Sequence, residues 1–426
     1  MQALLPSPAI AIVGRHNSGK TTLVEALIAH LSARGHDVGS IKHHSHAGFE
    51  IDIPGKDSYR HRHAGATETV VAAPGQMALI KDLPGELSCA QLVESMPGHD
   101  IIVVEGYRKS GLPTIEVMRA ANPADAAVAQ AFLQAARTGE PLSTDFVQSA
   151  RAQSHGDSAS AGVASPFQAD IQQKMPTATT VAVATDIPEA HEAAALFGIP
   201  AFNINDTHAL ADFIEAHYVR TKLSVVIQAG GESRRMGQSK ALVPFGGRPL
   251  IQHMVERLLP VADELIVTTN EAHRLQFLYQ EFPDARLRLV PDLLDRRGSL
   301  PGMLTALSAA THPYVAVIAC DMVFASPRLV AAESIEALET GADIVVPVNA
   351  HGFEPFHALY ARENCLAAVQ QRLGEGASSV QSFYDLVKVA KFPQSRVLQV
   401  EPMGGCFVNV NTPEELAQAE RNYLGA

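Results

Sequence analysis

The chain has 426 residues, of which 46% are hydrophobic, and its formal net charge at pH 7 is −12. This length predicts two or three domains, and the hydrophobic content is ample for their cores. The acidic balance excludes a protein that coats nucleic acid or an anionic membrane, because such a protein needs a dominant basic surface. We therefore expect neither nucleic acid nor a membrane among its partners.

The cysteines and the first residues indicate a cytoplasmic protein. Cys89, Cys320, Cys365 and Cys406 are scattered without a CxxC pair, which fits neither a disulfide framework nor a thiolate zinc site. No apolar run approaches the roughly 18 residues that span a bilayer. The start of the chain also lacks the basic segment of a secretory signal.

The first half of the chain predicts a parallel sheet covered by helices. Apolar runs of strand length alternate with helix-like segments, such as 20–33 with its apolar stripe. Each run is interpreted as a buried strand. The expected strands are 9–14, 68–73, 100–106, 180–185 and 201–204.

Residues 120–179 interrupt this alternation. Their stretch SARAQSHGDSASAGVASP is rich in Ser, Ala and Gly and lacks large apolar periodicity, which predicts a flexible insert. Within it, residues 124–136 are predicted to form an isolated helix. We interpret the insert as a tolerated surface insertion.

A second alternation of strands and helices begins after a boundary near Thr221. The predicted fold class is therefore α/β, with two three-layer αβα domains. They are expected at 1–220 and 221–426.

The segment GRHNSGKT, residues 14–21, matches the pattern G-x-x-x-x-G-K-[ST] between an expected strand and an expected helix. It predicts a nucleotide site, because backbone N–H groups and a helix N-terminus favour bound phosphate. Lys20 would neutralise phosphate oxygens, and Thr21 would offer a hydroxyl to Mg²⁺. Glu105 is the expected second magnesium ligand, with a solvated strand-end acid as the alternative. The predicted nucleotide-binding residues are Gly14, Asn17, Ser18, Gly19, Lys20, Thr21 and Thr22.

This half resembles the GTP-binding adapter protein of molybdopterin-guanine dinucleotide biosynthesis through IVGRHNSGKTT, GSIKHH, DIPGKDSYRHRHAGA and VVEGYR. The resemblance covers residues 10 to about 119 and resumes at 181–217, and the insert departs from it. It implies a P-loop NTPase-like domain with weak GTPase activity that assists a guanylyltransferase. We find no clean NKxD guanine-recognition motif, so GTP rather than ATP is implied by the resemblance.

A second glycine-rich segment, IQAGGESRRMGQSKAL at 227–242, lacks the P-loop spacing. It is similar to the loop of α/β nucleotidyltransferases, L-A-G-G-x-S-x-R-M-G-x-D-K. Arg235 and Lys240 can offset triphosphate charge as the bond to the α-phosphorus changes. Asp321, after the apolar run YVAVIAC, is the expected magnesium ligand beside that phosphate, with a plain strand-end acid as the alternative.

The second half resembles the molybdenum cofactor guanylyltransferases across 223–416. VVIQAGGESRRMG, TTN, VPDLLDRRGSLPGMLTAL, CDMVF, EPFHALY and FVNVNTPEEL match that family in order. The resemblance implies a Rossmann-like domain that transfers GMP from GTP to molybdopterin or Mo-molybdopterin, with Mg²⁺ as cofactor and release of pyrophosphate. It also implies a molybdenum insertion protein and molybdoenzyme chaperones as candidate partners. We therefore interpret the chain as a fusion of adapter and transferase.

The resemblance implies a site residue by residue. Asp321, Lys240 and Arg235 would be catalytic. Asn409 and Asn411 would bind the pterin. The implied GTP contacts are Ala229, Gly230, Lys240, Asn270, Asp292 and Asp321.

Three departures and several alternatives accompany this interpretation. Gln228 replaces a leucine, Ser239 replaces the acid before the lysine, and Ser378 and Ser379 lie where relatives can carry arginine. A molybdopterin cytidylyltransferase would share the loop and the acid. A GTP-dependent cofactor-delivery protein with an inactive transferase half is the other alternative, and Ser239 keeps it open.

Plainer structural roles exist for three of the implied contacts. Asn270 could cap a helix. Asn409 and Asn411 could form a turn before the TPEEL helix start.

Overall fold

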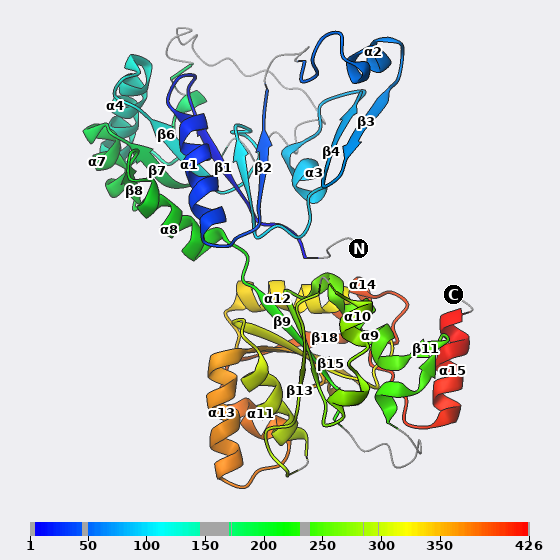
Figure 1. Ribbon diagram of the computed structural model, residues 1–426. Coiled ribbons are helices and arrows are strands. Elements are labelled where there is room, and N and C mark those ends of the chain that lie inside the picture. The colour runs from blue at the N-terminus through cyan, green and yellow to red at the C-terminus, as the bar shows by residue number, and fades with distance from the viewer. Residues whose placement is uncertain are drawn as a thin grey trace. The chain divides into compact units, whose positions relative to one another are not determined.

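The computed structural model describes residues 5–44, 50–144, 170–171, 173–230, 239–283, 285–296 and 298–424. The chain divides into two compact units, which we name the N-terminal unit (7–220) and the C-terminal unit (221–426 with 1–6). Each unit contains an α/β sheet, so the predicted fold class is confirmed (Figure 1). Within the described residues, no helix is long and apolar enough to cross a membrane. All four cysteines are free and buried.

The N-terminal unit is built on a parallel sheet of six strands in the order β2-β5-β1-β6-β7-β8. Its strands are nearly continuous apolar runs, because helices cover both faces. The strands are β1 (Ala9–Gly14), β2 (Val38–Lys42), β5 (Ile101–Glu105), β6 (Thr114–Met118), β7 (Thr180–Thr185) and β8 (Ala201–Asn203).

Alternate residues of β1 enter different cores. Ile10 and Ile12 pack with α1 (Lys20–Ala33) and α8 (Thr207–Tyr218). On the other face, one cluster includes residues of α4 (Pro123–Thr138) and α7 (Pro188–Leu196), and another includes Cys89 at the start of α3 (Cys89–Glu94). The sheet is therefore the middle layer of three, and the carboxyl ends of its strands form one edge.

One expected strand has a different environment from the predicted one. Residues 68–73 form β3 (Glu68–Ala73), which pairs only with β4 (Gln76–Lys81) among the described strands, in a separate antiparallel ribbon. Gly75, with φ of 78°, allows the tight turn between them. The apolar run therefore folds back on its neighbour, and Val71 is 47% exposed rather than buried. Helix α2 (Asp57–His63) precedes this ribbon.

The predicted isolated helix is corrected by the structure. Helix α4 begins where the flexible insert was expected to begin, and it buries Val128, Phe132 and Leu133 in a cluster shared with α7. The many alanines of α4 allow the two helices to approach closely. Because alanine is a weak signal of burial, this packing is not evident from the sequence. The prediction of flexibility for 145–169 and 172 falls outside the described residues.

The C-terminal unit contains an eight-stranded sheet in the order β13-β12-β9-β14-β17-β15-β16, with β18 paired to β15. β13, β12, β9 and β14 are parallel neighbours, and β17 runs antiparallel to both β14 and β15. The strands are β9 (Leu223–Gln228), β12 (Glu264–Thr268), β13 (Leu287–Val290), β14 (Tyr314–Ala319), β15 (Ile344–Asn349), β16 (Gly352–Phe353), β17 (His357–Ala361) and β18 (Val389–Pro393), with a small pair β10 (Pro244–Phe245) and β11 (Arg248–Pro249).

Helices cover both faces of this sheet. Val225 and Ile227 of β9 pack in a core that includes residues of α9, α12 and α14, and Val226 packs in a core that includes residues of α11 and α13. The helices are α9 (Leu250–Leu258), α10 (Leu278–Glu281), α11 (Ser299–Ala309), α12 (Pro327–Thr340), α13 (Arg362–Gly374), α14 (Gln394–Val400) and α15 (Pro413–Leu424). The segments that follow β9, β12, β13 and β14 thus meet at the carboxyl edge of the sheet.

Candidate functional site

The first glycine-rich loop has the backbone that a phosphate site needs. It leaves β1 at Gly14, where an added Cβ would lie 2.6 Å from the carbonyl oxygen of Val117 in β6, so a larger residue does not fit. Asn17 and Gly19 have φ of 63° and 87°, which turns the chain sharply into α1. No side chain caps α1 at Gly19, so its first N–H groups can receive an anion.

The side chains predicted to act with this loop lie beside it. Lys20 donates from Nζ to the carbonyl oxygen of Arg15 at 2.5 Å, and burial lowers the pKa of Lys20. The Thr21 hydroxyl donates to Glu105 Oε1 at 2.8 Å, and Lys42 Nζ lies 3.2 Å from Glu105 Oε2. The structure therefore brings Thr21 and Glu105 together, as the sequence predicts for a shared metal.

A hydroxyl and a carboxylate are oxygen donors that suit Mg²⁺, which is commonly completed by water and nucleotide phosphates. Within the described ranges, no group of three or more His, Cys, Asp and Glu side chains is placed to hold a metal ion. Thr21 and Glu105 therefore fit a metal site whose remaining ligands come from water and from the phosphates of a nucleotide.

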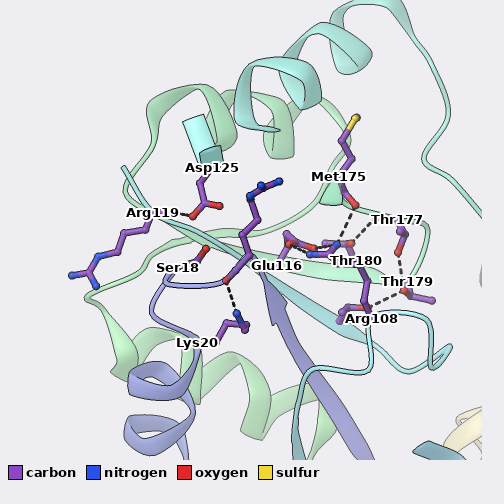
Figure 2. A network of polar contacts seen from close by, with 12 residues as sticks. Ser18, Lys20, Arg108, Glu116, Arg119, Asp125, Met175, Thr177, Thr179 and Thr180 are labelled. Carbon is purple, nitrogen blue, oxygen red and sulfur yellow. Dashed lines mark hydrogen bonds and ion pairs between the residues drawn. The ribbon is translucent and has the colours of Figure 1, made fainter. Parts of the chain in front are cut away.

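A polar network behind this loop includes residues that the sequence analysis did not single out (Figure 2). Asn122, the N-cap of α4, donates to the carbonyl oxygen of His16 at 3.0 Å. Asp125 in the same helix is fully buried and accepts from the backbone N–H of Arg119 at 3.0 Å. The Asn-Pro pair at 122–123 marks a helix start in the sequence, but its contact with the loop depends on the fold.

The same view shows Arg108 and Glu116 paired in the network (Figure 2). The two terminal guanidinium nitrogens of Arg108, Nη1 and Nη2, donate to the buried Glu116 carboxylate, the first of them at 2.6 Å. Burial raises the pKa of Glu116, and the charge of Arg108 opposes that shift. The charges of both side chains act on Lys20, because Glu116 raises the pKa of Lys20 and Arg108 lowers it.

In the C-terminal unit, three predicted GTP contacts meet after β9, β12 and β13. Asn270 Nδ2 donates to Asp292 Oδ2 at 2.9 Å, and the Asp292 N–H donates back to Asn270 Oδ1 at 3.0 Å. A Cβ added to Gly230 would lie 3.0 Å from Asp292 Oδ2. Gly230 thus allows the backbone to approach this pair closely, and the side chain of Asn270 bonds Asp292 rather than capping a helix. Ala229 is fixed nearby, since its N–H donates to the backbone carbonyl oxygen of Thr268 at 2.9 Å.

A second cluster joins a predicted catalytic lysine, a predicted metal ligand and a predicted pterin contact. Lys240 Nζ lies 2.8 Å from Asp321 Oδ2 and donates to Asn411 Oδ1 at 3.0 Å. The segment of Asn409 runs alongside, because Asn409 pairs with Met322 in an antiparallel bridge. The Asp321 carboxylate can hold a divalent cation, and the Lys240 ammonium group beside it can offset the negative charge of a triphosphate. Arg235 lies in 231–238, outside the described residues, so its role stays a prediction.

Comparisons with known proteins match each half of the chain to a protein family. Residues 9–136 match the family model of molybdopterin guanine dinucleotide synthesis protein B, and residues 225–389 match that of the MobA-like NTP transferase domain. The probable molybdenum cofactor guanylyltransferase of Natranaerobius thermophilus is 33% identical over 205 residues, which are 48% of this chain and 97% of that protein. The chain belongs to the molybdenum cofactor guanylyltransferase family. The two predicted resemblances are confirmed.

A second relative in sequence agrees with this assignment to the guanylyltransferases. The molybdenum cofactor guanylyltransferase of Desulfosudis oleivorans is 34% identical over 196 residues, which are 46% of this chain and 93% of that protein. Among solved structures, molybdopterin-guanine dinucleotide biosynthesis protein A of Archaeoglobus fulgidus is 23% identical with a TM-score of 0.42, covering 48% of this chain and all of that chain. The names of the relatives support guanylyl transfer over the cytidylyl and delivery alternatives.

The structure shows the surroundings of the three departures from the guanylyltransferase pattern. Lys240 is oriented by Asp321 and Asn411 rather than by an acid at position 239. Ser239 instead lowers the pKa of Glu271 through a hydrogen bond. The backbone oxygen of Ser378 accepts from the Leu300 N–H at 3.2 Å, which ties that segment to α11. The backbone oxygen of Gln228 accepts from the Cys320 N–H at 3.0 Å.

Two buried ionisable residues of the C-terminal unit were missed by the sequence analysis. Glu333 of α12 and His357 of β17 have no exposed surface, and Glu333 Oε1 lies 3.4 Å from His357 Nδ1. Burial raises the pKa of Glu333 from 4.5 to about 7, although His357 opposes the shift. Glu333 follows small apolar residues in a helix whose sequence gives no signal of its burial.

Glu333→Gln is expected to change how stability depends on pH. A carboxyl whose pKa is higher in the folded state than in the unfolded state makes its full contribution to the free energy of unfolding below the unfolded pKa. That contribution is lost as pH rises through the folded pKa. The parent should therefore lose stability relative to the variant between pH 4.5 and about 7, by about 3 kcal/mol for a shift of this size. Calorimetric melting of both proteins across that range checks this. A difference in melting temperature that does not vary with pH would contradict it.

Proposed function

We propose that the C-terminal unit transfers GMP from GTP to the terminal phosphate of molybdopterin or Mo-molybdopterin, which forms molybdopterin guanine dinucleotide and releases pyrophosphate. The family match and the names of the relatives support this reaction. The observation that carries it in this chain is the convergence of Lys240, Asp321 and Asn411. Three residues expected to contact phosphate, metal and pterin lie within one hydrogen-bonded cluster.

The chemistry follows from the charges in this cluster. The acceptor phosphate attacks the α-phosphorus in line, and pyrophosphate leaves without a covalent enzyme intermediate. A phosphate monoester is already largely ionised near neutral pH, so no strong general base is needed. Lys240, and Arg235 as predicted, stabilise the charge that develops on the phosphate oxygens. Gly230, Asn270 and Asp292 hold the nucleotide, with Ala229 beside them, and Asn409 and Asn411 hold the pterin.

A divalent metal is typical of nucleotidyltransferases of this type, and we propose Mg²⁺. Asp321 would hold it in the C-terminal unit, and Thr21 with Glu105 would hold it in the N-terminal unit. When bound, it neutralises charge on phosphate oxygens. Mg²⁺ suits both places because the available side-chain donors are oxygens.

The N-terminal unit would bind GTP on its P-loop and assist the transferase. Gly14, Asn17 to Thr22 and Glu105 would form its nucleotide site. Fusion raises the effective concentration of one unit at the other to about millimolar when the connection can span the sites. A molybdenum insertion protein and molybdoenzyme chaperones remain predicted partners, and the cytoplasm remains the predicted compartment.

Pyrophosphate release by the full-length chain tests the proposed function. Each of the four nucleoside triphosphates is supplied with molybdopterin present or absent. We expect release with GTP, and only when molybdopterin is present. Faster release with CTP would favour the cytidylyltransferase, and no release by the folded protein would favour the delivery protein.

A further inference from the structure

The segment that connects β14 to α12 carries Asp321 and is anchored along its length. At its start, the Asp321 carbonyl oxygen accepts from the Val410 N–H at 3.0 Å. At its end, Ser326 caps α12 by accepting from the Leu329 N–H at 3.0 Å. A proposed metal ligand is thus part of a short connection that is hydrogen-bonded at both of its ends.

Two side chains of α9 hold the middle of this segment. His253 Nε2 donates to the carbonyl oxygen of Val323 at 3.0 Å. Arg257 donates from Nε to the carbonyl oxygen of Ala325 at 2.6 Å. His253 is only 5% exposed, so these bonds lie largely out of water. Bonds to buried backbone carbonyls fix the path of the chain, because leaving such a group without a partner is costly.

The end of the segment depends on an imidazole acceptor. The Ser326 N–H donates to His357 Nε2 at 3.0 Å, and the Ser326 hydroxyl donates to Glu401 Oε1 at 2.5 Å. Ser326 and His357 are completely buried. Since a backbone N–H can only donate, His357 Nε2 must carry no proton, and the proton of the neutral ring must lie on Nδ1.

Glu333 is placed to select that tautomer. Its Oε1 lies 3.4 Å from His357 Nδ1, the nitrogen that must carry the proton. Within the described residues, Nδ1 and the two carboxylate oxygens are buried and none of them has a hydrogen-bond partner of ordinary geometry, so the contact that the structure gives Nδ1 is this pairing with Glu333 at 3.4 Å. A carboxylate that faces one ring nitrogen favours the proton there and leaves the other nitrogen free to accept.

We propose that His357 and Glu333 are positioning residues for Asp321: Glu333 fixes the tautomer of His357, and His357 fixes the segment that carries the metal ligand. This inference rests on the proposed transferase reaction. Neither residue belongs to the nucleotide cluster of Gly230, Asn270 and Asp292. The pair should therefore affect the rate of transfer more than the binding of GTP.

A pair of substitutions at position 357 separates positioning from packing. His357→Phe fills the space but cannot accept from Ser326, whereas His357→Gln can place an amide oxygen there. We expect kcat for pyrophosphate release to fall about 10- to 100-fold in His357→Phe, because a displacement near 1 Å can cost about 100-fold. KM for GTP should change little, and His357→Gln should stay close to the parent.

Amide hydrogen exchange supplies a readout that does not depend on activity. In His357→Phe, peptides that cover 320–326 should exchange faster than in the parent, and in His357→Gln they should not. A folded His357→Phe protein with parental kcat would overturn the inference, and so would equal loss in both variants. Failure of the parent to release pyrophosphate would instead contradict the proposed function.

Position 333 gives an independent version of the test if His357→Phe does not fold. Glu333→Leu removes the group that selects the tautomer, and Glu333→Gln keeps an oxygen that can accept from Nδ1. We expect the leucine variant to lose kcat and the glutamine variant to retain it. Parental kcat in a folded leucine variant would overturn the inference.

Discussion

Asp321→Asn is expected to lower guanylyl transfer about 1,000-fold or more in a chain that still folds, because metal ions and fixed donors each contribute several kcal/mol to such reactions. Asparagine has nearly the same size as aspartate but lacks the negative charge that would hold a divalent cation. In the parent, that charge lies 2.8 Å from Lys240 Nζ, so the substitution also removes the ion pair that orients the lysine. Pyrophosphate release with GTP and molybdopterin, measured over a range of Mg²⁺ concentrations, gives the size of the loss.

Asp385→Asn is the matched control for that experiment. Asp385 pairs with Arg372 at 2.6 Å on the surface of the same unit, and its side chain is 68% exposed. The same chemical change there should leave turnover near the parental value, because exposed ion pairs contribute little. Turnover by Asp321→Asn that matches this control would show that Asp321 is not the metal ligand.

Lys20→Ala is expected to weaken GTP binding by the N-terminal unit about 100-fold, which is the value of one or two charge-assisted hydrogen bonds. The side chain is partly buried behind the P-loop and bonded to the carbonyl oxygen of Arg15. Alanine leaves the phosphates without this charge while the backbone N–H groups remain. Isothermal titration of the full chain with GTP should show two classes of site in the parent and one in the variant.

Lys81→Ala provides the comparison for Lys20→Ala. Lys81 pairs with Glu68 on the β3–β4 ribbon, and its side chain is 56% exposed. Removing it takes away the same charge from the same unit without touching the P-loop, so both classes of site should persist. Two classes of site in Lys20→Ala would refute nucleotide binding at the P-loop. Unchanged pyrophosphate release in a variant that has lost the P-loop site would refute the proposal that the N-terminal unit assists the transferase.

Much of the fold and the chemical centre could be predicted because motif and strand coincide. GRHNSGKT follows a strand and opens a helix, so the motif by itself places Lys20 and Thr21 at the start of that helix. Lys240 and Asp321 are 81 residues apart. They meet because both follow parallel strands, and the carboxyl ends of such strands share one edge of the sheet.

The remaining features depend on long-range packing that local sequence does not encode. ETVVAA has the composition of a buried strand, but a turn at Gly75 pairs it with β4 and leaves it exposed. Helix α4 is rich in alanine and has only a short stripe of large apolar residues, Val128, Phe132 and Leu133, yet it packs with α7.

Glu333 and His357 are 24 residues apart and belong to different elements. They meet only because β17 inserts antiparallel between β14 and β15, under α12. No regular spacing in the sequence indicates that these two residues pair, so their positioning role could be inferred only from the structure.

The fate of the α-phosphorus of GTP tests the central claim most directly. Full-length protein is incubated with molybdopterin and with GTP that carries radioactive phosphorus at either the α or the γ position. We predict that label from the α position appears in the pterin product of the parent and is lost in Asp321→Asn, and that label from the γ position appears in pyrophosphate. A pterin product labelled from the γ position, or α label that never leaves the free guanine nucleotides, would contradict the account.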